Sequence, residues 1–219
     1  MRRGTLAMCL LLVAGTAQAA DMTVLRYLDQ DAGDPSYVTR ILVTADFLRM
    51  DGGEDGGDFI LLDRRTRRVF NVLHDARMTM QFVPGKLPDR PQPWKARLAA
   101  QPGAAGTLRY RLSVGEALCS EGSVAPRAAP DAARALGELK GVLAATQYRV
   151  WRDTPREMQH DCDLANLVWD AGAVPGLGLP LEEREFSGKT RRIESQASEP
   201  VRPELFHVPD GYAVVHAPS

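Results

Sequence analysis

Residues 58–82 read DFILLDRRTRRVFNVLHDARMTMQF, and this stretch decides the fold. Two turns divide it into three short runs with strand character, at 58–63, 68–74 and 78–82. In the last run Met78, Met80 and Phe82 alternate with polar residues, which is the period of a strand with one buried and one wet face. The stretch therefore predicts consecutive antiparallel strands joined by tight turns.

The segments on either side extend this pattern along the chain. Further strands are expected at 22–28, 37–43, 46–51, 107–114, 147–152, 181–186 and 189–197. Helices are expected at 132–145, where leucines recur at helical spacing, and at 161–171. The proline- and glycine-rich stretch 84–106 predicts a long irregular excursion within one domain. Strands with one apolar face need covering helices, so the sequence predicts an α+β fold built on an antiparallel sheet.

Composition narrows the class of protein. The chain has 219 residues, of which 44% are hydrophobic and 25% are charged, as in ordinary globular domains. A formal net charge of -1 excludes a strongly basic protein that binds polyanions through its overall charge. Aromatic residues make up only 6%, which argues against a stacking surface for nucleobases. We therefore expect no nucleic-acid partner.

The first residues have the pattern of a secretory signal peptide, expected at residues 1–19. Arg2 and Arg3 precede a short apolar run, and Ala17-Gln18-Ala19 has the small residues of a cleavage site. Cleavage after Ala20 fits almost as well. The expected mature protein is a single domain at 20–219, located in the periplasm. No second long apolar run follows, so we expect no integral membrane segment after cleavage.

Cys119 and Cys162 are the two cysteines that remain after cleavage. An even pair in an oxidising compartment predicts one disulfide. The alternative is a redox or metal-binding pair, which would be expected to show a C-x-x-C spacing that the sequence lacks.

Other charged clusters have simpler explanations than a catalytic or metal site. The acidic segment 51–58 lacks the ligand spacing of a calcium loop and is expected to be a flexible turn. The basic run 64–68 is expected to be a hairpin turn, with an anionic partner as the alternative. Glu182, Glu183 and Glu185 are expected to be solvated. No serine elbow or dinucleotide fingerprint is found, so we expect no enzyme, no metal and no cofactor.

Five segments of the chain together resemble a known family. They are Asp46–Asp51 (DFLRMD), Phe59–Asp63 (FILLD), Val69–Val72 (VFNV), Met78–Met80 (MTM) and the tail Phe206–Tyr212 (FHVPDGY). Their succession resembles the periplasmic lipoprotein-carrier-like (LolA/LolB-type) superfamily, and more closely the secreted domains of unknown function related to it. The resemblance implies a strongly curved antiparallel half-barrel whose few helices cover its concave face. It also implies an apolar cavity for acyl chains and no catalytic residues.

Two functions are compatible with these observations. The first is a soluble periplasmic binding or carrier protein, without catalysis, for an apolar or lipidated ligand such as a lipid or a lipoprotein. Met78, Met80 and Phe82 would line its ligand site, because flexible methionines suit adaptable apolar surfaces, although the same residues also fit an ordinary core. The alternative is a periplasmic interaction protein with a filled core that acts through its surface loops. The sequence leaves the oligomeric state open.

Overall fold

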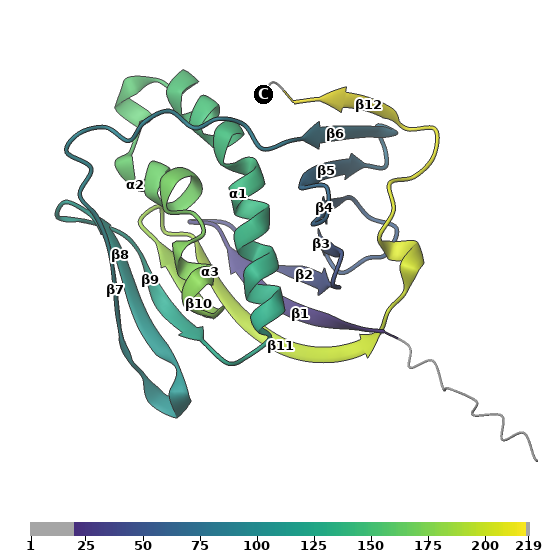
Figure 1. Cartoon of the computed structure of the whole chain (residues 1–219), viewed down its shortest axis with the longest axis horizontal. Helices are drawn as coiled ribbons and strands as arrows, with labels where there is room; N and C mark the ends of the chain where they lie inside the picture. Colours follow the sequence, from purple (N-terminus) through teal and green to yellow (C-terminus); the bar gives the residue numbers. More distant parts are fainter. Residues whose placement is uncertain (1–19, 218–219) are drawn as a thin grey trace, which may run out of the picture.

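Twelve strands form one open, curled sheet in the computed structural model, which describes residues 20–217 (Figure 1). Neighbouring strands are antiparallel, except that β12 pairs with β6 in parallel. The strands are β1 (Asp21–Gln30), β2 (Tyr37–Val43), β3 (Phe47–Asp51), β4 (Phe59–Asp63), β5 (Arg68–Leu73), β6 (Met78–Phe82), β7 (Ala96–Pro102), β8 (Leu108–Val114), β9 (Ala117–Ala125), β10 (Leu179–Glu185), β11 (Thr190–Pro200) and β12 (Ala213–His216). The α-helices are α1 (Pro130–Asp153), α2 (Asp161–Leu164) and α3 (Ala173–Leu177), with a π-helical segment, Ala165–Trp169, between the last two.

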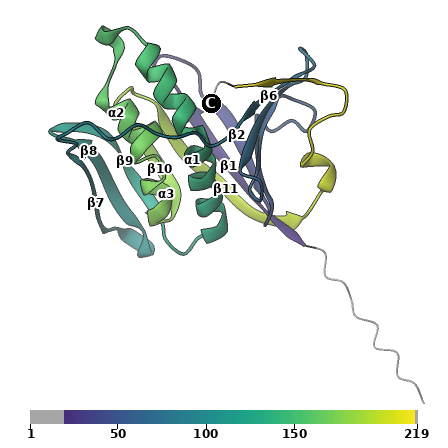
Figure 2. The same cartoon turned by 45° about the horizontal axis from the view of Figure 1, so that its top comes forward.

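The sheet has two wings joined by its two longest strands. Its order is β12-β6-β5-β4-β3-β2-β1-β11-β10-β9-β8-β7, with β1 and β11 paired along their whole length near the middle. We call β2–β6 with β12 the first wing and β7–β10 the second wing. Figures 1 and 2 show the two wings standing on either side of α1. The expected α+β fold with an antiparallel sheet is confirmed.

The central strands of the first wing, β2 to β5, are covered on both faces, whereas β12 at its edge is exposed. On one face Leu48, Leu62 and Val69 pack with Leu136 and Leu139 of α1. On the other face the tail after β11 covers the sheet, and its buried side chains there are Leu205 and Phe206. A wing covered on both sides needs few polar residues, which explains the nearly continuous apolar run of β4.

Helix α1 is longer than the sequence predicted, and the strand expected at 147–152 is wrong. Pro130 and Asp131 occupy its first turn, as expected for a helix start, but the helix continues to Asp153. The sequence of residues 147–152 is also compatible with the exposed end of a helix. The helix ends just before Thr154-Pro155, because a residue that precedes proline disfavours the helical conformation. The prediction failed because six alternating residues do not distinguish the two periods.

Two further predicted segments need correction, and other elements were not predicted. The excursion 84–106 contains an ordered strand, β7. The helix expected at 161–171 is divided between α2 and the π-helical segment, and α3 follows in a segment for which the sequence predicted no helix. Strand β9 was not predicted, because its sequence ALCSEGSVA has little apolar alternation.

The predicted disulfide is confirmed. Cys119 in β9 and Cys162 in α2 are bonded, with 4.8 Å between their Cα atoms. The bond ties the short helices to the second wing, where Leu112 and Ala165 pack beside it. Among the helices of residues 20–217, none combines the length and apolarity needed to cross a membrane.

Candidate functional site

The proposed wall residues lie on the α1 face of the first wing. Phe82 is half-buried against the core beneath α1, and Met78 and Met80 are half-buried on the same face of β6. Thr79, on the opposite face, is fully buried where the first wing is covered by the chain's tail. The structure therefore places Met78, Met80 and Phe82 together, but it does not place them in either hollow described below.

The acidic and basic turns have structural partners. Asp51 accepts hydrogen bonds from Arg40 and Arg49, and Asp55 forms an ion pair with Arg202 of the tail. Burial alone would raise the pKa of Asp51, but the two arginines hold it below its usual value. These carboxylates therefore fix the Gly-rich loop to its neighbours. Among residues 20–217 no three His, Cys, Asp or Glu side chains are grouped to hold a metal ion.

The first arginine of the basic turn is also occupied. Arg64 reaches from the end of β4 to α1 and donates hydrogen bonds to Asp131 and Glu138. These two carboxylates raise the pKa of Arg64, although burial opposes them. Arg64 therefore anchors the helix, while Arg65 and Arg68 remain exposed.

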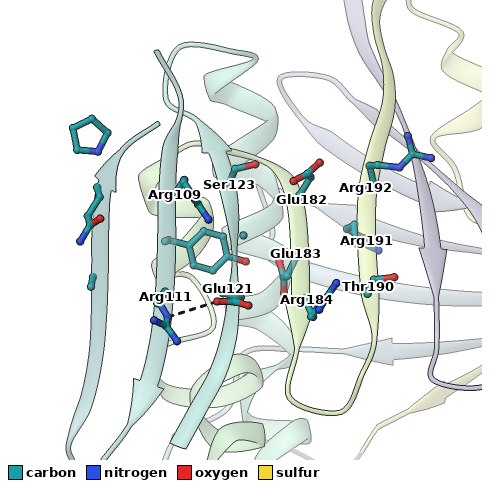
Figure 3. A pocket seen from close by; sticks show the side chains of 15 residues that line it. Arg109, Arg111, Glu121, Ser123, Glu182, Glu183, Arg184, Thr190, Arg191 and Arg192 are labelled. Carbon is teal, nitrogen blue, oxygen red and sulfur yellow. Dashed lines mark ion pairs between the residues drawn. The ribbon is translucent and has the colours of Figure 1, made fainter. Parts of the chain in front are cut away.

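One of the hollows in the described part of the chain lies on the outer face of the second wing, opposite the helices (Figure 3). We call it the arginine hollow; its volume is about 910 Å³. The residues around it come from β7 to β11: Ala99, Gln101, Pro102, Arg109, Tyr110, Arg111, Glu121, Gly122, Ser123, Glu182, Glu183, Arg184, Thr190, Arg191 and Arg192. Pairing of the strands places distant parts of the sequence side by side here.

Strand register arranges the charged side chains of the hollow in two rows. One row runs Gln101, Arg109, Ser123, Glu182, Arg192 across β7 to β11. The other row runs Ala99, Arg111, Glu121, Arg184, Thr190 across the same strands. Because side chains alternate between the faces of a sheet, both rows point outward. Each row therefore presents two arginines and one glutamate.

The arginines of the hollow are largely free of protein partners. Arg111 lies 3.6 Å from Glu121, and both side chains are substantially exposed, so this pair contributes little stability. Arg109, Arg184 and Arg192 are exposed and form no ion pair with any residue in 20–217. The hollow therefore offers three unpaired guanidinium groups, which favour carboxylates and phosphates as ligands.

A row of ionisable side chains supports the hollow from the inner face. Tyr110, Glu183, Arg191 and Asp29 follow one another across β8, β10, β11 and β1. Arg191 donates two hydrogen bonds to Asp29, both 2.7 Å long. Burial alone would raise the pKa of Asp29, but Arg191 and the Thr39 hydroxyl lower it below its usual value. This ion pair holds β11 in place beside β1 at the edge of the hollow.

A close approach of two strands shapes the middle of the hollow. The pairing of β10 with β9 shifts between Pro180 and Glu182. A side chain on Gly122 would collide with the carbonyl oxygen of Glu182. Glycine is therefore required at this position for β10 to lie against β9.

The three glutamates of β10 do not share one environment, which corrects the prediction that all are solvated. Glu182 is exposed on the outer face, while Glu183 and Glu185 are half-buried on the inner face. Burial raises the pKa of Glu185, and the charge of Glu183 raises it further, while Lys140 and Lys189 lower it. Strand alternation predicts that Glu182 and Glu183 point to opposite faces, but the sequence did not show that helices would cover one of these faces.

A second, more open hollow of about 560 Å³ lies between the N-terminal half of α1 and α3. Small residues border it, including Ala133, Gly137 and Gly176, together with Arg134 and Glu138. Glu138 is already held by Arg64, so this hollow has fewer free charged groups than the arginine hollow.

Comparison with known proteins assigns no family. No family model matches the sequence, and no curated protein sequence matches it. Among solved structures, two of PNGF-II, in the C2 and P21 space groups, align with TM-scores of 0.36 and 10% identity. The alignments cover 90% and 91% of this chain but only 31% and 32% of the PNGF-II chains. At these scores the matches carry no conclusion about fold family or activity, and the resemblance to lipoprotein carriers stays a prediction.

Proposed function

We propose that this chain is an exported, non-catalytic binding protein that holds an anionic ligand in the arginine hollow. The observation that carries the proposal is the set of exposed arginines around a hollow of about 910 Å³. Unpaired guanidinium groups bind carboxylates and phosphates through charge-assisted, often bidentate hydrogen bonds. The overall charge of -1 conceals this local concentration of positive charge.

The packing of α1 favours action through the surface. Leu136, Leu139 and Val142 of α1 pack directly with the sheet core. An apolar ligand on that face would have to displace these side chains, whereas the arginine hollow is open to solvent. The proposal therefore follows the second sequence hypothesis, a filled core with a functional surface.

The disulfide supports the exported location, because such bonds persist mainly in oxidising compartments. The signal peptide expected at residues 1–19 lies outside the described residues. We further propose that the face under α1 is the concave side of a half-barrel, as the resemblance to lipoprotein carriers implies.

The carrier hypothesis retains support from one observation. Met80 and Phe82 are half-buried on the α1 face, and Val83, just after β6, is exposed. Native mass spectrometry of the purified protein tests this second candidate. Recovery with bound lipid that is lost in Met80→Ser would favour it, and repeated recovery without lipid would count against it.

Calorimetric titration with tripolyphosphate and with citrate tests the anion site. The double variant R184Q/R192Q should weaken binding of at least one of these anions by about tenfold or more, because each charge-assisted hydrogen bond contributes about 1.5–3 kcal/mol. The matched control is R65Q/R68Q, which removes the same charge from an exposed turn and should change affinity by less than about twofold. Equal losses in the two variants would show that the anions respond to overall charge, and the proposal would then be wrong.

A further inference from the structure

We propose that the ligand of the arginine hollow is an acidic polysaccharide segment, a chain of uronic-acid sugars lying across strands β8 to β11. The inference rests on the proposed function and names the chemical class of its ligand. Four features of the hollow carry it: the spacing of the arginines, the glutamates between them, the neutral polar groups beside them and the absence of an exposed ring in the lining.

The arginines start from backbone positions that are spread across four strands. Neighbouring strands are about 4.8 Å apart, so the backbone positions of Arg111 on β8 and Arg184 on β10 are separated by about 10 Å. By the same spacing those of Arg109 on β8 and Arg192 on β11 are about 14 Å apart. A single phosphate or carboxylate could contact several of them only if their long side chains converged on it. A ligand with carboxylates repeated along a chain can contact several of these arginines at once.

The glutamates select against dense negative charge. Glu121 lies between Arg111 and Arg184 in one row, and Glu182 lies next to Arg192 in the other. A polyphosphate or a nucleic-acid backbone would bring negative groups against these carboxylates, and like charges at close range repel. A uronic-acid chain brings hydroxyl groups between its carboxylates, and a hydroxyl donates a hydrogen bond to a glutamate.

Neutral side chains extend the same pattern. Gln101 and Ser123 flank Arg109 in its row, and Thr190 flanks Arg184 in the other. Amide and hydroxyl groups both donate and accept hydrogen bonds, so they suit sugar hydroxyls. The two rows thus offer cationic positions for carboxylates and neutral or acidic positions for the hydroxyls between them.

The lining has no exposed aromatic platform. Tyr110 is its aromatic residue, and that side chain is only 1% exposed because it packs inward against α3. Nucleobases bind single-strand sites largely by stacking on exposed rings. The hollow therefore fits a carboxylated sugar chain better than a single-stranded nucleic acid.

Fluorescence anisotropy with a labelled oligogalacturonate of eight sugars tests the inference. Unlabelled oligogalacturonates of one to eight sugars compete, together with tripolyphosphate and a thymidine oligonucleotide. Affinity should rise by about tenfold or more between the monosaccharide and the tetrasaccharide, because additional carboxylates then reach additional arginines. R109Q/R192Q should flatten this dependence on length, while R65Q/R68Q should leave it unchanged.

Glu121→Gln supplies a result that overall charge alone does not predict. It should strengthen tripolyphosphate binding by about tenfold, because a repulsive carboxylate is removed, and should strengthen oligogalacturonate binding much less. Phosphate or oligonucleotide binding equal to or tighter than octamer binding in the unmodified protein would overturn the sugar assignment while leaving the anion site intact. Absence of binding for every anion would overturn both proposals.

Discussion

Arg191 of β11 donates two hydrogen bonds of 2.7 Å each to Asp29 of β1, in the strand pair that joins the two wings of the sheet. The Asp29 side chain is 1% exposed, and its second partner is the Thr39 hydroxyl of β2. The Arg191 guanidinium also lies over the Tyr27 ring, 5.1 Å from its centroid. This contact connects the covered first wing with the strands that border the arginine hollow.

Asp29→Asn should lower the free energy of unfolding by about 3 kcal/mol, because it leaves a mostly buried guanidinium without its counter-charge. Urea unfolding followed by circular dichroism measures the change. Asp31→Asn is the matched control on the same side of the sheet. Its carboxylate is 46% exposed and lies 3.6 Å from Lys189, so its loss should cost less than about 1 kcal/mol. Similar losses in both variants would contradict the role given to the Asp29–Arg191 pair.

Acid should destabilise the protein through the buried carboxylates Asp29 and Asp51. Their arginine partners lower both pKa values from 3.8, so the folded state binds fewer protons than the unfolded state near that pH. The resulting stability is present above 3.8 and is lost as the pH falls through the lowered values. Urea midpoints measured between about pH 6 and about pH 3 should fall steeply below about pH 4. The Asp51→Asn variant should have a lower urea midpoint at about pH 6, and its midpoint should fall less between about pH 6 and about pH 3. An equal fall in the variant and the unmodified protein would contradict the role given to Asp51.

The positions of the first-wing strands could be predicted closely, because turn residues separate their short runs, but the face of Thr79, which was expected to be solvent-exposed, is buried. The expected strands 37–43 and 78–82 have the bounds of β2 and β6 in the structure. The second wing was harder, because β9 is polar and includes Gly122, whose role depends on contact with β10. Local pattern does not reveal such a contact between distant segments.

The arginine hollow could not be predicted from the sequence for a related reason. Arg109 and Arg111 alternate with apolar residues in the expected strand 107–114, and the polar side of such a strand usually faces water without any function. Arg184 and Arg192 are about 70–80 residues further along the chain, and the register of β8 to β11 brings them to the same face of the sheet. By contrast, the disulfide was predictable, because the two cysteines that follow the expected signal peptide leave only one intramolecular pairing.

Glu185→Gln should stabilise the protein at neutral pH. Burial and the nearby Glu183 raise the pKa of Glu185, so the folded state favours its protonated form. The stabilising effect of that proton is fully present below the ordinary value of 4.5 and is lost as the pH rises through the raised pKa. At about pH 7 the free energy of unfolding of the variant should therefore exceed that of the unmodified protein by up to about 1 kcal/mol, and this difference should shrink towards about pH 4. Glu182→Gln, on the opposite face of β10, should show no such trend in the same urea series.

Removal of the disulfide should loosen the short helices before it unfolds the sheet. Cys119 and Cys162 are 43 residues apart, and closing a loop of that length stabilises a protein by at most about 4 kcal/mol. The double variant C119S/C162S should lose about 2–4 kcal/mol of unfolding free energy in urea. Hydrogen exchange should increase most in residues 161–177. There α2 and the π-helical segment are held by this disulfide and by two hydrogen bonds of Asn166, which accepts one from the Ser120 hydroxyl and donates one to the Cys119 carbonyl. Strands β2–β6 should keep their protection, because their core is formed with α1 and the tail. A uniform loss of protection over the whole chain would instead show that the disulfide holds the fold together as one cooperative unit.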